Sequence, residues 1–437
     1  MKPGERRFRT DHGMLVLLEE AHELPIVDID LALRTGSVHD PKGLEGVTRL
    51  GWRLVRMGTR ELRGPEVEEA ISRLGARLSI EISTSWVRIH GTVIRRNLGA
   101  FVELIASLLR RPALRKSDLA QVRRETLADL VAIRDNDRVL AARAFRRTLF
   151  DGHAYGRPVM GTVRTIRAID RSHVAAYLER HLRDSNAVLG VAGDVSADEL
   201  RRLVDAHLSG LGGGRAPRER IGRARVRRGR HVVLIDKPER SQTQIYIGTL
   251  GTRAGDPEYF PLLVANTAFG GTFTARLMQE VREKRGWSYG AYSLFGSDRQ
   301  RDAWYMWTFP SAEQAADCIA LELELLEGLV GTGPSAAEHR FARRYMVNSH
   351  CFDLETAGKR LEPRLDEELY ELPPGYYRDY PRSVRAVTRA QSIAALRARL
   401  SPTDLVIALV ATARELAPRL EALPGVRSLT VIPHDRD

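Results

Sequence analysis

The stretch LALRTGSVHDP, from Leu31 to Pro41, has a counterpart later in the chain, IGTLGTRAGDP, from Ile247 to Pro257. Pro41 and Pro257 lie 216 residues apart, which is about half of the 437-residue chain. In both stretches a segment typical of a β-strand runs into an Asp-Pro turn, and a helical pattern follows. A repeat on this scale indicates that the chain contains two copies of one unit.

The elements predicted after each turn support the repeat. Each copy continues with a strand-like segment, ARLSIEIS from Ala76 in the first and AWYMWTF from Ala303 in the second. A long amphipathic helix is predicted next, from Asn97 and from Ala312. Strands followed by a layer of helices are typical of an α+β sandwich. We therefore expect an α+β fold with two homologous domains, each a mainly antiparallel sheet covered by helices.

The predicted domain boundaries follow this repeat. We expect an N-terminal domain at 1–212, a linker at 213–230 and a C-terminal domain at 231–437. The linker contains RAPRERIGRARVRRGR, a run rich in arginine that follows several glycines. Such a run is typical of a solvated connection, and a docking strip for an acidic partner is the alternative.

The composition limits the classes of partner. A net charge of +12 and a pI near 10 could indicate a nucleic acid or a membrane surface. The arginines are spread among acidic residues, however, and no binding motif with interleaved aromatic residues accompanies them. We expect no nucleic-acid or membrane partner. No apolar run is long enough for a signal or a membrane span, so a cytoplasmic location is predicted, or a periplasmic one if a leader has been removed.

The helical pattern after the first Asp-Pro turn carries an unusual cluster. In GVTRLGWRLVRMGT, Gly46 to Thr59, the apolar residues recur with the spacing of one helix face. Arg49, Trp52 and Arg53 lie outside that stripe. Taken alone, two arginines four residues apart indicate a solvated helix face.

Three further segments carry a resemblance to a known family. They are DGHAYGRPVMGTVRTI at 151–166, NAVLGVAGDV at 186–195 and FGGTFTARLMQEVREKRGWSYGAYS at 269–293. With them the chain resembles the pitrilysin/insulinase-type metallopeptidases, the inverzincins. The resemblance implies two similar domains that together form half of a clamshell.

The same resemblance implies that the metal site of this chain is degenerate. Catalytic members carry H-x-x-E-H on the helix before the Gly-Thr pair, where two histidines hold zinc and the glutamate acts as general base. Those positions here are Arg49, Trp52 and Arg53, and the third ligand position is Asp129. Guanidinium has no lone pair to offer a metal, so we expect no zinc in this chain. Whether the arginines pair with Asp129 or with Glu125 stays open.

The C-terminal half retains an arginine and a tyrosine that are functional in the family. By resemblance, Arg282 and Tyr289 bind the substrate backbone and stabilise the oxyanion that forms at the zinc. Both side chains are hydrogen-bond donors that can address a carbonyl oxygen as it gains charge. The alternative is that they are ordinary surface and core residues. We expect Gly286 to end the helix between them.

Together these features imply the zinc-less subunit of a heterodimeric processing-peptidase-like enzyme. Some bacterial and organellar members pair such a subunit with a homologous subunit that carries zinc. The expected partners are that subunit and a peptide substrate, and zinc is expected only in the partner. The alternatives are a structural core subunit, as in the cytochrome bc1 complex, a basic protein that binds an acidic surface, and a homodimeric peptide-binding scaffold.

Overall fold

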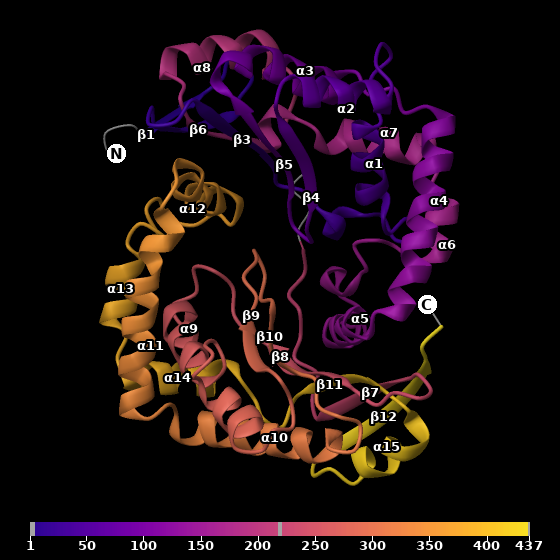
Figure 1. The fold of residues 1–437 in the computed structure, drawn as a ribbon, viewed down its shortest axis with the longest axis vertical. Helices are drawn as coiled ribbons and strands as arrows, with labels where there is room; N and C mark the ends of the chain where they lie inside the picture. Colours follow the sequence, from indigo (N-terminus) through magenta and orange to yellow (C-terminus); the bar gives the residue numbers. More distant parts are fainter. Residues whose placement is uncertain (1–4, 217–220, 436–437) are drawn as a thin grey trace. The chain divides into compact units, whose positions relative to one another are not determined.

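The computed structural model describes residues 5–216 and 221–435, and Figure 1 shows its helices and strands. Residues 217–220 of the predicted linker therefore lie outside the described residues. The described chain divides into two compact units. Unit 1 comprises residues 5–130, 157–216 and 352–377, and unit 2 comprises residues 131–156, 221–351 and 378–435.

Unit 1 is built on a six-stranded sheet in the order β1-β2-β6-β3-β5-β4. Its strands are β1 (Glu5–Arg9), β2 (Leu15–Glu20), β3 (Ile26–Leu33), β4 (Arg77–Ile82), β5 (Val87–Ile94) and β6 (Ala187–Gly193). Its helices are α1 (Val47–Arg56), α2 (Gly64–Arg73), α3 (Leu98–Arg110), most of α4 (Lys116–Ala132), α6 (Val163–Ala168), α7 (Arg171–His181), α8 (Ala197–Leu203) and α12 (Ala357–Leu369). β6 is buried along its whole length, as expected of a strand covered on both faces.

Unit 2 is built on a second six-stranded sheet, in the order β12-β7-β11-β8-β10-β9. Its strands are β7 (Arg230–Asp236), β8 (Gln244–Leu250), β9 (Ala291–Phe295), β10 (Ala303–Thr308), β11 (Val406–Ala411) and β12 (Val426–Pro433). Its helices are α5 (Asp137–Leu149), α9 (Tyr259–Phe269), α10 (Ala315–Thr332), α11 (Ala336–Ser349), α13 (Tyr380–Ala386), α14 (Arg389–Arg399) and α15 (Ala413–Glu421). Across the described part of the chain, every helix is too short or too polar to cross a membrane.

The two sheets share one topology. The strands β2-β6-β3-β5-β4 correspond to β7-β11-β8-β10-β9, with a parallel first pairing and antiparallel pairings after it. This match confirms the predicted α+β fold with two similar domains. The sixth strands differ, since β1 pairs antiparallel with β2 and β12 pairs parallel with β7. The sheets are thus mixed, because long crossover connections allow the parallel pairings.

One predicted correspondence within the repeat is wrong. The segment ARLSIEIS forms the edge strand β4, whose counterpart in the second sheet is β9. The segment AWYMWTF forms β10, whose counterpart is β5. Only one strand of each hairpin was recognised from the sequence, and a different one in each copy.

Each sheet is covered on one face by a helix from the other half of the sequence. Helix α5 packs on β7, β8 and β11, and helix α12 packs on β2 and β6. Leu361 and Leu365 of α12 join a buried cluster with residues of β2 and β6. A Cβ atom on Gly190 would lie 2.9 Å from side-chain carbons of both leucines, so α12 can approach the sheet only at a glycine. The compact units therefore differ from the contiguous segments 1–212 and 231–437.

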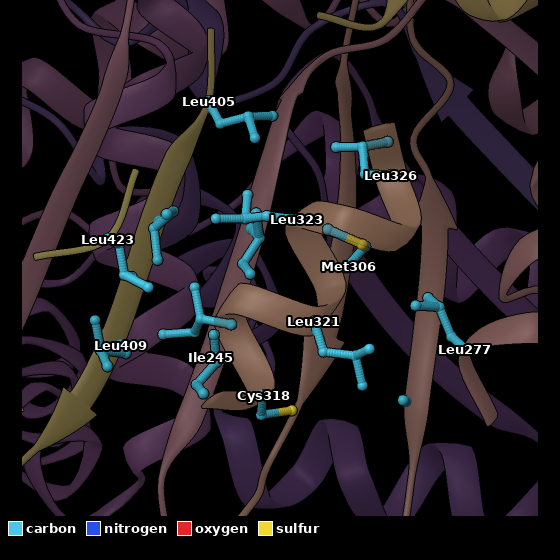
Figure 2. Close-up of a cluster of buried hydrophobic side chains, with 14 of the residues drawn as sticks. Ile245, Leu277, Met306, Cys318, Leu321, Leu323, Leu326, Leu405, Leu409 and Leu423 are labelled. Atoms are coloured by element: carbon cyan, nitrogen blue, oxygen red, sulfur yellow. The ribbon is translucent and has the colours of Figure 1, made fainter. Parts of the chain in front are cut away.

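Helix α10 packs its apolar face on the second sheet and forms the core of unit 2. Leu323 and Leu326 of α10 belong to one buried cluster with Ile245 of β8 and Leu409 of β11, and Figure 2 labels all four side chains. Glu322 lies on the same helix and is completely buried, and neither of its carboxyl oxygens has a hydrogen-bond partner in the described structure. Burial alone raises the pKa of Glu322 to about 8.

Candidate functional site

Helix α1, which carries the degenerate metal motif, is anchored at its N-terminus by Asp40. The carboxylate of Asp40 accepts hydrogen bonds from the backbone N–H of Gly46, at 2.7 Å, and of Thr48, at 3.1 Å, and from the Thr48 hydroxyl. A carboxylate at this place satisfies free N–H groups and interacts favourably with the helix dipole. Burial raises the pKa of Asp40 to about 7, and these hydrogen bonds oppose the rise. The Asp-Pro turn of the repeat thus fixes where α1 begins.

Arg53 links α1 to α4. Its Nη2 atom lies 2.7 Å from an oxygen of Glu125, and its Nη1 atom lies 3.2 Å from an oxygen of Asp129. The same Nη1 atom donates to the Thr126 hydroxyl at 3.0 Å. The pairing that the sequence left open therefore involves Arg53 and both carboxylates. A guanidinium therefore joins α1 and α4.

Arg49 lies one turn before Arg53 and is half-buried, but no carboxylate of residues 5–216 or 221–435 is within ion-pair distance of it. Its Nε atom is buried and has no hydrogen-bond partner in that part of the chain. Burial lowers the pKa of Arg49, the positive charge of Arg53 lowers it further, and Asp129 opposes both effects. Arg49 thus has no direct ion pair within the described residues, and Asp129 offsets only part of the cost of its charge on the face that it shares with Arg53.

This set of side chains does not fit a zinc ion. Neither arginine can donate a lone pair, and Trp52 is fully buried with an indole N–H that can only donate. Asp129 already binds Arg53, and one carboxylate cannot complete a tetrahedral site. Among the described residues, no group of three or more His, Cys, Asp or Glu side chains is placed to hold a metal.

Arg282 and Tyr289 come together in unit 2. Arg282 lies on a short π-helical turn, Met278–Glu283, and Gly286 ends this turn with a positive φ of 64°, as expected. The Arg282 guanidinium carbon lies 4.7 Å from the ring centre of Tyr289 and 4.4 Å from that of Phe273. Both rings are exposed, Tyr289 by 76% and Phe273 by 58%. The guanidinium is held over two aromatic rings at the surface of the unit.

Arg282 also has unused hydrogen-bonding capacity. Its Nη1 atom is buried and has no hydrogen-bond partner in the described structure. Its ion pair is a long contact of 3.8 Å between Nε and the carboxylate of Glu283. Among the described residues, the side-chain N–H groups of Arg282 make no hydrogen bond of normal length. They can therefore donate to a carbonyl oxygen of a ligand.

Two residues of these sites were not found from the sequence. Phe273 lies in the segment FGGTFTARL, but nothing in the spacing indicates that its ring contacts Arg282. Thr126 lies between Glu125 and Asp129 on α4, and its hydroxyl also donates to the Val122 carbonyl at 2.7 Å. A threonine in a helix often makes that bond, so the sequence contains no signal of its contact with Arg53.

Comparisons with known proteins match both halves of the chain. Residues 15–163 match the model of the family described as Insulinase (Peptidase family M16), and residues 168–346 match the model described as Peptidase M16 inactive domain. An uncharacterized zinc protease of Mycobacterium tuberculosis is 26% identical over 385 residues, or 87% of each chain. An uncharacterized zinc protease of Streptomyces coelicolor is 26% identical over 293 residues, which span 66% of this chain and 64% of that protein.

The solved structures agree in fold. The crystal structure of a peptidase M16 inactive domain from Pseudomonas fluorescens has a TM-score of 0.87 with this chain, at 24% sequence identity. The match covers 93% of this chain and 97% of that one. The sheet topology and the two family matches lead to one conclusion. The chain belongs to the peptidase M16 family.

Proposed function

We propose that this chain is the zinc-less subunit of a heterodimeric M16 peptidase. The partner is a homologous subunit with an intact H-x-x-E-H motif, and that subunit holds the zinc. This chain closes the peptide-binding chamber and supplies Arg282 and Tyr289 to the partner's zinc site. Neither chain alone is then expected to cleave peptides.

The geometry of Arg282 carries the proposal. A buried N–H group without a partner is costly in a folded protein, because its lost hydrogen bonds to water are not replaced. Such a group is accounted for if a ligand supplies the acceptor. The carbonyl of a bound peptide, which becomes an oxyanion during hydrolysis, has the required charge and shape.

The α1 motif supports the same division of roles. Two arginines replace the histidines, and one of them is fixed by Glu125 and Asp129 of α4. Two fixed positive charges repel a dication. The N-terminal half of this chain therefore lacks the means to activate water, and a chain that retains only oxyanion donors needs a second chain for hydrolysis.

A reconstitution assay tests the proposal. The partner to be used is the homologue of similar length from the same genome that carries H-x-x-E-H and lacks the arginine and tyrosine pair. Each purified chain and their equimolar mixture are assayed with a library of quenched fluorescent peptides. We expect no cleavage by either chain alone and cleavage by the mixture, because the zinc and the oxyanion donors then meet in one site.

Two other outcomes would contradict the proposal. Cleavage by the partner alone, with no increase on adding this chain, would make this chain dispensable. Stable association of the two chains without any cleavage would indicate a structural core subunit instead. Size-exclusion chromatography of the mixture with light-scattering detection separates that result from failure to associate.

A further inference from the structure

Arg49 has an unusual environment for a half-buried cation. Its Nε atom is buried and unpartnered, and neither Glu125 nor Asp129 pairs with it. Both of those carboxylates bind Arg53 instead. A half-buried guanidinium beside a second guanidinium is electrostatically unfavourable, and Asp129 offsets this cost only in part, so a bound anion would stabilise the charge of Arg49.

The neighbouring side chains restrict what can bind. Two carboxylates flank Arg53 on the α4 side, so they repel anions there and hold its guanidinium in place. Within residues 5–216 and 221–435, the Arg49 guanidinium makes no hydrogen bond to another residue, and it shares the helix face with Arg53. A small, planar anion that takes two parallel N–H donors suits a guanidinium best, and a carboxylate has this geometry.

We propose that the vacated metal position on α1 is a carboxylate-binding site, with Arg49 as the residue that binds the anion. The site has the opposite charge preference to that of the zinc site which occupies this position in catalytic relatives. The inference rests on the proposed function only in taking the carboxylate to belong to a peptide. Its source is either the C-terminus of the peptide or an acidic side chain.

Peptide binding to the full chain, without any partner subunit, tests this site. Three short peptides with an uncharged BODIPY label serve as probes, and they share one apolar sequence apart from a glutamate in the third. One has a free C-terminal carboxylate, one has a C-terminal amide, and one has the amide and an internal glutamate. Dissociation constants are measured by fluorescence anisotropy at low and at high salt. We expect the amide without glutamate to bind at least about tenfold more weakly than the best carboxylate probe, and added salt to reduce this difference.

The variant Arg49→Gln should abolish the difference in affinity between the carboxylate and amide probes. The glutamine side chain has neither the charge nor the paired donors of the guanidinium. Arg49→Lys retains the charge without the fork and should give intermediate binding. The matched control is Arg56→Gln, on the same helix. Arg56 already forms two hydrogen bonds of 3.0 Å with Glu68, so its replacement should leave peptide binding unchanged.

Each outcome bears on the inference. If the peptide with the free C-terminus binds most tightly, the ligand is a C-terminal carboxylate. If the peptide with the glutamate binds most tightly, the ligand is an acidic side chain. Equal affinity for all three peptides overturns the proposal. An equal loss of affinity in Arg49→Gln and Arg56→Gln also overturns it. No zinc or partner is present in this assay. The reconstitution assay can therefore fail while the carboxylate site is confirmed, and the reverse also holds.

Discussion

Replacing Arg282 by alanine is expected to reduce turnover by the reconstituted heterodimer about 100-fold, the scale found when an oxyanion donor is removed. The physical reason is that Nη1 of Arg282 has no hydrogen-bond partner among the described residues and can donate to the developing charge. Tyr289→Phe should lower turnover in the same direction, since it removes a hydroxyl and keeps the ring that supports Arg282. The measurement is kcat and KM for one quenched peptide.

The control for this experiment is Arg285→Ala. Arg285 lies three residues after Arg282, and its charge is paired with Glu280 at 3.0 Å. Its loss should change kcat little. A fall in kcat for Arg282→Ala with little change in KM indicates an interaction made in the transition state, whereas a rise in KM alone indicates ground-state binding. Unchanged kcat and KM in both Arg282→Ala and Tyr289→Phe would remove the pair from the mechanism.

Replacing Glu322 by methionine is expected to stabilise unit 2 strongly at neutral and alkaline pH. The carboxyl group is completely buried and has no hydrogen-bond partner among the described residues, whereas methionine suits the apolar surroundings and the helix. With the pKa raised from 4.5 to about 8, the cost of keeping this group protonated in the folded state is about 3 kcal/mol at pH 7. The measurement is the free energy of unfolding in urea, followed by tryptophan fluorescence.

The stability gained by Glu322→Met should depend on pH. Because the folded state holds the proton and the unfolded state releases it, the wild type loses stability as pH rises from about 4.5 to about 8. Below that range both states are protonated, and the ionisation cost disappears. The advantage of Glu322→Met should therefore grow with pH across this window. Glu324→Met, an exposed change on the same helix, should show no such trend. A pH-independent difference between the Glu322 variant and the wild type would refute the assignment.

The sequence predicts the repeat of two similar sheets, but it misses several of their strands and does not show which helices cover them. The repeat of strand, Asp-Pro turn and helix can be recognised because the residues within each segment determine its local structure. An amphipathic helix such as α5 or α12 shows which of its faces is apolar, but not which sheet that face meets. Its partner is decided by tertiary packing, for instance by the space that Gly190 leaves for Leu361 and Leu365.

The candidate sites could likewise be predicted only in part from the sequence. The resemblance located Arg49 and Arg53, but helical spacing treats the two arginines alike. Only the position of α4 gives Arg53 the two carboxylates and leaves Arg49 without one. The burial of Glu322 had no signal either, since it and the exposed Glu324 stand in one run, ALELELLEGL. Phe273 likewise reaches Arg282 through a fold of the chain that spacing does not encode.

The central claim is that fixed positive charge has replaced a metal ion on α1. Zinc content, measured by plasma mass spectrometry on this chain alone and on the reconstituted heterodimer after dialysis against a weak chelator, tests it most directly. The expected result is no stoichiometric zinc in this chain and one zinc per heterodimer, contributed by the partner. One tightly bound zinc per molecule of this chain, purified alone, would contradict it.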